Sequence, residues 1–341
     1  MTHSATARFL HVANGTSTTT LIDAARIPGV LSIWADPLHE GPVPGGLSDE
    51  ALLELRARHL ATLADPTFAA WSGHDASLDA VNDLRQWRAT IERHEAYDEA
   101  ILWFEHDLFD QLNLIQLLPW IRQHVPLGKA VSLVCIGSFP GRPGFKGLGE
   151  LTPDELASLL ETRQRVGEPQ YALAERAWRA FRQPTPEELD DMRRGDTSSL
   201  PYLSAAVARF LEEYPWTTDG LSRTERRLLE LADVEGTTLL QAVPRMHDGE
   251  DAYYITDTSV VALTRQLTGT APPLLMWSPT PATEGGLHGS VRITDAGRAV
   301  LEARQDRVRI CGVDRWLGGV HLQGNTDLWR WDAARRRMTR M

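Results

Sequence analysis

Residues 99–124 read EAILWFEHDLFDQLNLIQLLPWIRQH, and their pattern changes once, near residue 106. The run EAILWFEH, 99–106, is short, apolar and rich in aromatic and branched residues, which is typical of a buried β-strand. The residues that follow form a longer apolar segment that begins with an aspartate, a residue favoured at helix starts. This order predicts a strand that passes directly into a helix.

The same alternation extends over the first 150 residues. The predicted strands are 7–14, 29–36, 99–106 and 129–138. The predicted helices are 48–65, 77–94, 107–124 and a segment ending at Ile27, for which Thr18–Thr20 would supply N-cap hydroxyls. Apolar strands separated by helices predict an α/β fold with a mainly parallel, Rossmann-like sheet that helices cover on both faces.

The rest of the chain predicts two further regions. The Gly/Pro-rich segment 141–149 is expected to link the α/β domain, 1–149, to a helical connector, 150–218. Residues 219–341 resemble a winged helix, because helices beginning at Ser222 are followed by two strands and a closing helix. A terminal hairpin is expected around Gln323–Asn325.

Composition narrows the class of protein. The chain has 341 residues, 42% of them hydrophobic and 24% charged, as in ordinary globular proteins. It shows neither a long apolar span nor a secretory signal, and its two cysteines are too few for a disulfide framework. We therefore expect a cytoplasmic protein without a membrane partner. The net charge of −11 makes nucleic acid an improbable general partner, since polyanions are bound through Lys and Arg.

Polar side chains collect where the predicted strands end. Because parallel strands point the same way, the loops after them meet at one edge of the sheet, where ligands bind. The residues concerned are His11, Asn14, Gly15, Thr16 and Ser17 from the first strand, Asp36, His39 and Glu40 from the second, Glu105, His106, Asp107, Asp110 and Gln111 from the third, and Ser138 from the fourth.

His39, Glu40, Glu105, His106 and Asp107 are the candidate catalytic residues, because carboxylates and imidazoles serve general acid–base chemistry. The others are candidate ligand-binding residues. No cofactor is indicated by a motif, but a divalent metal is left open. Suitable oxygen and nitrogen ligands are offered by Asp36, His39, Glu105, His106 and Asp107, although no pair among them has the helical His-x-x-x-His spacing.

Structural alternatives exist for several of these residues. Asn14–Ser17 could bind an anion at a helix N-terminus, or could be a simple turn and cap. Asp107 could act in catalysis or cap the helix it precedes. His11, inside a strand, could be a core histidine with satisfied hydrogen bonds. Ser138 lacks the Gly-x-Ser-x-Gly context of a serine nucleophile, and Cys135 is expected to be an inert buried thiol.

Several motifs together resemble one bacterial family of unknown function, the domain-of-unknown-function family number eighteen thirty-five, with an uncharacterised C-terminal domain. They are HVANGTS, DPLHEGPVP, LWFEHDLFDQLNLIQLL, FKGLGELTP, GVDRWLGGVHL and LWRWD. The resemblance covers nearly the whole chain and implies no established reaction.

These observations favour an enzyme, a hydrolase or group transferase, that acts on a phosphate- or carboxylate-bearing small molecule such as a nucleotide. The alternative is a ligand-sensing transcriptional regulator that binds DNA through the winged helix. Its expected recognition helix, 257–268, offers only Arg265 and Gln266 for DNA contacts, so packing or dimer contact is the simpler role. A catalytically inactive binding protein and a homo-oligomer are both left open.

Overall fold

The computed structural model describes residues 8–63, 80–278 and 289–341. The chain forms two compact units, each assembled from several segments. The first unit comprises Met1–His39, Val81–Phe181 and Met192–Ala206, and the second comprises Glu40–Ala80, Arg182–Asp191 and Val207–Met341. The boundaries expected after residues 149 and 218 divide the chain differently and stay a prediction.

The first unit contains a five-stranded sheet in the order β2-β1-β4-β5-β6. The strands are β1 (Phe9–Ala13), β2 (Val30–Ile33), β4 (Glu99–Glu105), β5 (Ala130–Ile136) and β6 (Gln164–Arg165). All neighbours pair in parallel except β6, which pairs antiparallel with β5. The predicted Rossmann-like, mainly parallel sheet is therefore confirmed.

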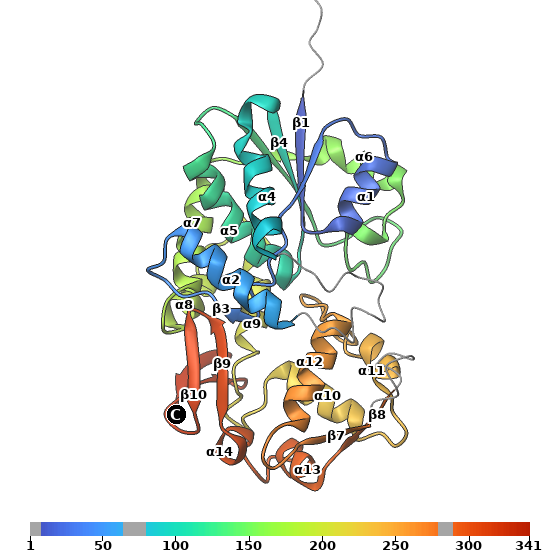
Figure 1. Cartoon of the computed structure of the whole chain (residues 1–341), viewed down its shortest axis with the longest axis vertical. Helices are drawn as coiled ribbons and strands as arrows, with labels where there is room; N and C mark the ends of the chain where they lie inside the picture. Colours follow the sequence, from blue (N-terminus) through green and yellow to red (C-terminus); the bar gives the residue numbers. More distant parts are fainter. Residues whose placement is uncertain (1–7, 64–79, 279–288) are drawn as a thin grey trace, which may run out of the picture. The chain divides into compact units, whose positions relative to one another are not determined.

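Helices cover both faces of this sheet. Figure 1 shows α1 and α6 on one side of β1 and β4, and α4 and α5 on the other. The helices of this part of the chain are α1 (Thr16–Ala24), α4 (Ala80–Glu92), α5 (Leu108–His124), α6 (Pro153–Ser158), α7 (Glu168–Phe181), α8 (Glu187–Arg194) and α9 (Leu203–Leu211), with short 3-10 turns at His94–Ala96, Leu148–Glu150 and Leu159–Thr162. Residues 77–79 of the predicted helix 77–94 lie outside the described residues.

The central helix α5 follows β4 after only two residues. Asp107 is its N-cap, and the carboxylate of Asp107 accepts a hydrogen bond from the Asp110 backbone N–H at 2.9 Å. Most of α5 is buried, because it packs on the sheet and against α7. A helix with apolar residues on all sides is expected in such a position.

The start of α1 differs from the sequence prediction. The helix begins at Thr16, with Gly15 as N-cap and without a side-chain capping bond, so Thr18–Thr20 lie inside it. The buried Thr18 hydroxyl donates instead to the Asn14 side-chain oxygen at 3.4 Å. The threonine hydroxyls were misassigned because a glycine can also occupy the N-cap position.

The segment 141–149, expected to be a link, is part of the core of the first unit. Phe145 is 5% exposed and Leu148 0% exposed, and both pack in a cluster with Ala13, Ile22 and Trp103. The Gly/Pro composition concealed two large apolar side chains that need burial. The next helix, α6, begins as expected, with Thr152 as N-cap in a capping box.

The second unit contains the predicted winged-helix-like arrangement. Its elements are α10 (Arg223–Ala232), α11 (Leu239–Arg245), α12 (Asp257–Thr268), β7 (Leu275–Ser278), β8 (Ser290–Ile293) and α13 (Asp295–Leu301). Ser222 caps α10 in a capping box with Glu225, as predicted. The strands β7 and β8 pair antiparallel. Residues 279–288, which join these two strands in the chain, lie outside the described residues.

The same unit contains α2 (Asp49–Leu63), α14 (Arg307–Cys311) and two small sheets. One sheet has the order β10-β9-β3 and the other joins β11 to β12. Their strands are β3 (Gly41–Pro42), β9 (Val313–Gly318), β10 (Val320–Gly324), β11 (Trp329–Asp332) and β12 (Arg337–Arg340). Residues 64 and 65 of the predicted helix 48–65 lie outside the described residues. Within the described residues, no helix is long and apolar enough to span a bilayer.

The hairpin expected around Gln323–Asn325 was misplaced. The turn lies at Gly318 and Gly319, because Leu317 pairs with Val320 across β9 and β10. Gly318 has a φ of 60°, and a Cβ on Gly319 would lie 2.1 Å from the Arg182 carbonyl oxygen. Both positions therefore require glycine.

The burial of segment 141–149 gives a first prediction. Leu148→Ala should lower the free energy of unfolding by about 2–5 kcal/mol, because it removes a fully buried side chain. Urea denaturation followed by circular dichroism measures the change. Leu127→Ala is the control, since Leu127 is 91% exposed, and should cost within about 0.5 kcal/mol. Equal small effects of the two substitutions would indicate a solvated link.

Candidate functional site

The strand order creates a switch point between β1 and β4. From β1 the chain passes through α1 to β2 on one side, whereas β4 pairs with the other side of β1. Ligands in open parallel sheets bind outside the carboxyl ends of the strands at such a point. Here Asn14 follows the end of β1, and residues Glu105–Asp110 span the end of β4 and the start of α5.

Three carboxyl groups gather at the carboxyl end of β4. Glu105 is the last residue of the strand, Asp107 is the N-cap of α5, and Asp110 lies in its first turn. All three are buried, and each offers an oxygen atom within 4.8 Å of those of the other two. Strand end, cap and first turn are brought together because only two residues separate β4 from α5.

Asp110 connects this group to β1. Its Oδ2 atom accepts a hydrogen bond from Asn14 Nδ2 at 2.6 Å, and its Oδ1 atom accepts one from the Glu105 backbone N–H at 2.7 Å. The sequence-based expectation that Asn14 and Asp110 share one edge of the sheet agrees with this geometry. Asp110 thus ties the two strand ends on either side of the switch point.

The loop 145–149, in which Phe145 and Leu148 are buried, contacts Glu105. The Leu148 backbone N–H donates to Glu105 Oε1 at 2.6 Å. A Cβ on Gly147 would lie 2.4 Å from Glu105 Oε2, so a side chain at this position would collide with the carboxyl group. Sequence reasoning missed both contacts, although the Gly-rich composition of the segment was a signal of close backbone approach.

Burial and mutual repulsion keep protons on these carboxyl groups. Burial, then the charge of Asp107, raises the pKa of Glu105 to about 8. Burial also raises the pKa of Asp107 and, together with the charges of Asp107 and Glu105, raises that of Asp110 well above its usual range. Like charges this close cannot all ionise in a buried site, so protons or a cation must balance them.

Amides on α5 fix the surrounding backbone. The Gln111 side-chain N–H donates to the Glu105 carbonyl at 2.7 Å. Asn113 accepts a bond from the Asp36 backbone N–H at 3.0 Å and donates to the Asp36 carbonyl at 2.9 Å. Sequence reasoning did not single out Asn113. It is a polar residue among the apolar residues of this helix, and such a position could have indicated a buried hydrogen bond.

The two candidate histidines belong to the first unit. His106 packs edge-on to Tyr202, with ring centroids 6.0 Å apart, and the Tyr202 hydroxyl accepts a bond from the Gly137 N–H at 3.0 Å. His39 packs edge-on to Phe109. Positive charge on either imidazole would favour ionised Asp107. Tyr202 gave no signal in the sequence.

Asn14 connects the amino terminus of α1 to the carboxyl cluster, because its side chain is bonded to Asp110. Thr16 and Ser17 are exposed there, and Gly15 has open space where a side chain would stand. Backbone N–H groups at such an end, with the positive end of the helix dipole, are suited to an anionic group.

Among the described residues of the first unit, neither His11 nor Ser138 contributes an atom to this cluster. His11 Nδ1 accepts a bond from Trp103 Nε1 at 3.1 Å, and its other nitrogen lies 3.3 Å from the Pro28 carbonyl, while burial lowers its pKa. These contacts correspond to the core-histidine alternative. Ser138 is exposed in the loop after β5. Glu40 belongs to the second unit, where its carboxylate accepts from the Ser259 hydroxyl at 2.9 Å.

Cys135, expected to be a buried thiol, is half-buried and contacts the strand end at Glu105. Its sulfur donates to the Glu105 carbonyl at 3.4 Å, and burial raises its pKa.

Comparison with known proteins adds little to this description. No family model and no curated protein matches the chain. Among solved structures, the Orc1 protein of Aeropyrum pernix in complex with DNA matches with 13% sequence identity and a TM-score of 0.22, over 84% of this chain and 90% of that chain. A likeness at this TM-score carries no functional argument.

The raised pKa of Glu105 predicts how stability depends on pH. Its folded-state pKa of about 8 exceeds the ordinary 4.5, so the folded protein holds a proton that the unfolded chain releases between these values. The free energy of unfolding should therefore fall as the pH rises from about 5 to 8, by at most about 1.4 kcal/mol per pH unit per proton. Glu105→Gln should flatten this fall, as denaturation at several pH values would show.

The matched control is Glu161→Gln, at an exposed position of the same unit, which should keep the wild-type dependence. A Glu105→Gln curve parallel to the wild type would show that Glu105 ionises normally.

Proposed function

We propose that the first unit is an enzyme, a hydrolase or group transferase, that acts on a phosphate- or carboxylate-bearing small molecule such as a nucleotide. The observation that supports this most is the bond between Asn14 and Asp110. It joins an anion-favouring helix terminus to a buried carboxyl cluster at the switch point of a parallel sheet. This arrangement can bind an anionic small molecule and place acid–base groups beside it.

In this proposal the anionic group of the ligand contacts the backbone N–H groups at the start of α1. Gly15 allows close approach, and Thr16 and Ser17 add hydroxyl groups. The reacting part of the ligand would then lie toward Asp107 and Glu105.

Glu105 is proposed as the proton donor. A general acid works best when its pKa lies near the operating pH, and the pKa of Glu105 is raised to about 8. Asp107 helps to hold that proton in place, because an ionised Asp107 disfavours ionisation of Glu105. The histidines at 39 and 106 are proposed to stabilise the ionised form of Asp107.

We further propose that a divalent cation binds the carboxyl cluster. Glu105, Asp107 and Asp110 supply oxygen atoms, the ligands that Mg²⁺ and Mn²⁺ prefer, within one small volume. A bound cation would supply charge that offsets the repulsion between these carboxylates and an anionic ligand. Binding must displace the protons that Asp107 and Asp110 otherwise hold, whereas Glu105 keeps its proton and remains the donor.

The family resemblance is part of the proposal. HVANGTS contains Asn14, LWFEHDLFDQLNLIQLL contains the three carboxyl residues, and FKGLGELTP contains Gly147 and Leu148. Three of the motifs that carry the resemblance thus supply the groups of this site. A cytoplasmic location likewise remains part of the proposal.

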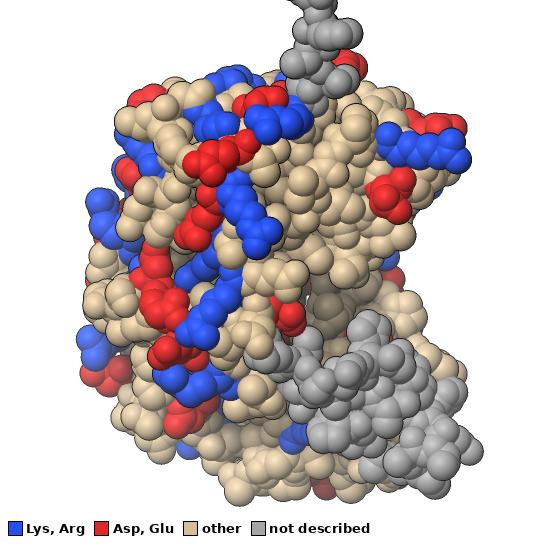
Figure 2. Space-filling model, turned by 45° about the horizontal axis from the view of Figure 1, so that its top comes forward, with Lys and Arg blue, Asp and Glu red and all other residues tan. Residues whose placement is uncertain are grey.

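The regulator hypothesis receives less support. The residues at the start of a winged-helix recognition helix usually contact DNA. Here α12 begins with Asp257, and Ser259 in its first turn is bonded to Glu40. Figure 2 shows Lys and Arg side chains interleaved with Asp and Glu on the face drawn.

Asp107→Asn tests cation binding directly. Asparagine also serves as an N-cap, so α5 should keep its start while the charge is lost. Isothermal titration of the full chain with Mn²⁺ in two buffers of different ionisation enthalpy should show binding with proton release at pH 7. The variant should bind Mn²⁺ at least about tenfold more weakly, since a charged ligand is lost.

The control is Asp154→Asn, the same change in the exposed first turn of α6, which should bind as the wild type does. Unaltered Mn²⁺ affinity in Asp107→Asn would contradict the proposed cation site.

Turnover is tested with a panel of nucleoside mono-, di- and triphosphates in the presence of Mg²⁺, followed by ³¹P NMR. At least one should be consumed. Glu105→Gln should slow that reaction by about 10²–10⁴-fold, the usual contribution of a positioned proton donor. Asp154→Asn should leave it unchanged. Wild-type rates in Glu105→Gln, or no conversion of any panel member, would contradict the proposal.

A further inference from the structure

A pocket lies at the opposite end of the sheet from the carboxyl cluster. It is lined by the end of α5, the start of β5, the edge strand β6 and the first turn of α7, all within the first unit. Lys129 and Val131 mark the start of β5, whereas Ile136 at its end pairs with Glu105. A strand of this length separates the two sites by roughly 20 Å, so the pocket is distinct from the proposed catalytic site.

The pocket combines apolar walls with positive charge. Its volume is about 230 Å³, and Val125, Val131 and Val166 contribute to its walls. Three cations, Arg122, Lys129 and Arg165, line it against one carboxylate, Glu168. In a chain whose net charge is −11, this local excess of positive charge favours an anionic ligand.

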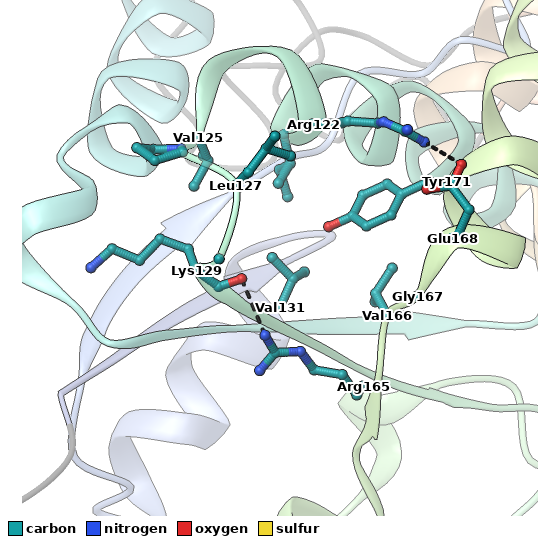
Figure 3. Close-up of a pocket in the computed structure, with 13 residues that line it drawn as sticks. Arg122, Val125, Leu127, Lys129, Val131, Arg165, Val166, Gly167, Glu168 and Tyr171 are labelled. Carbon is teal, nitrogen blue, oxygen red and sulfur yellow. Dashed lines mark hydrogen bonds and ion pairs between the residues drawn. The ribbon is translucent and has the colours of Figure 1, made fainter.

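Two of the three cations are already engaged. Figure 3 shows the Arg122 guanidinium paired with Glu168, at 2.9 Å, and the Lys129 side chain extending away from Tyr171. The Lys129 ammonium donates to the Tyr97 carbonyl at 2.6 Å. Neither charge is therefore fully available to a ligand.

Arg165 is the cation that remains. The one hydrogen bond of its side chain in the described chain is a long contact of 3.4 Å to the Lys129 carbonyl, and it has no ion pair among the described residues. Its guanidinium group consequently retains donors for a carboxylate or phosphate, which it can bind in a bidentate manner.

Tyr171 supplies a second polar group. Its hydroxyl extends between Leu127 and Val131 in Figure 3, and it has no hydrogen-bond partner within the described residues. Burial raises the pKa of Tyr171 despite the nearby charges of Arg165 and Arg122, so the hydroxyl keeps its proton and can donate. The ring of Tyr171 is held in place by the Arg122 guanidinium, 5.7 Å from its centroid.

We propose that this pocket binds a small organic anion, whose carboxylate or phosphate group contacts Arg165 and the Tyr171 hydroxyl. The apolar body of the ligand packs against the valine side chains. The volume lies below the ~300–1,000 Å³ of pockets that hold drug-sized ligands, so the ligand is small. The pocket would give the first unit a second ligand site, independent of the reaction at the other edge.

The test uses benzoate, phenyl phosphate and the neutral benzyl alcohol, each titrated into the full chain by isothermal calorimetry and NMR. Benzoate or phenyl phosphate should saturate the pocket, and the tighter of the two identifies the anionic group. Benzyl alcohol should bind at least about tenfold more weakly, since it lacks the charge that pairs with Arg165.

Arg165→Gln should raise the dissociation constant of the tighter anion by about tenfold, and Tyr171→Phe should raise it several-fold. Arg176→Gln is the matched control, because Arg176 is an exposed arginine of α7 outside the pocket. Asp107→Asn should also leave the affinity unchanged, which separates this site from the carboxyl cluster. Wild-type affinity in Arg165→Gln, or no saturable binding of either anion, would overturn the proposal.

Discussion

The burial of three carboxyl groups at one strand end is the constraint on which the first unit depends. Glu105, Asp107 and Asp110 lie too close together, and too far from water, for all of them to be ionised at neutral pH. Their hydrogen bonds to Leu148 and Asn14 satisfy particular oxygen atoms but do not supply a countercharge. Protons or a cation must supply that countercharge. Burying carboxyl groups so close together destabilises the fold, and such groups usually occur where they have a chemical role.

The surrounding fold explains how this arrangement is maintained. The short connection from β4 to α5 brings the three acids together, and the switch point places Asn14 beside them. The loop 145–149 is held against Glu105, because Phe145 and Leu148 are anchored in the core with residues of α1 and α6. The site is thus built from β1 with α1, from β4 with α5, and from the loop 145–149 that two buried side chains anchor.

Local patterns predicted much of this organisation. The strand, cap and first turn around Glu105–Asp110 follow from residues that are adjacent in sequence, and the parallel sheet places Asn14 at the same edge. The contact between Glu105 and Leu148 could not be predicted, because it joins residues 43 positions apart through a backbone N–H. Likewise, nothing local shows that Glu40 leaves the first unit immediately after His39.

Where the sequence prediction failed, glycine was usually the reason. The N-cap of α1 depends on Gly15, and the turn between β9 and β10 depends on Gly318 and Gly319. Polar residues nearby, such as Thr18 and Gln323, gave competing signals of comparable strength. The prediction for segment 141–149 failed for another reason. Its glycines and prolines indicated a link, and the two apolar residues that the structure buries, Phe145 and Leu148, were given too little weight.

The most direct measurement of the central claim is a ¹³C NMR titration of the Glu105 side-chain carboxyl group, assigned by its loss in Glu105→Gln. We expect a midpoint near pH 8 without added metal, and a midpoint shifted to lower pH by saturating Mg²⁺. A midpoint near the ordinary value of 4.5, unaffected by Mg²⁺, would contradict it.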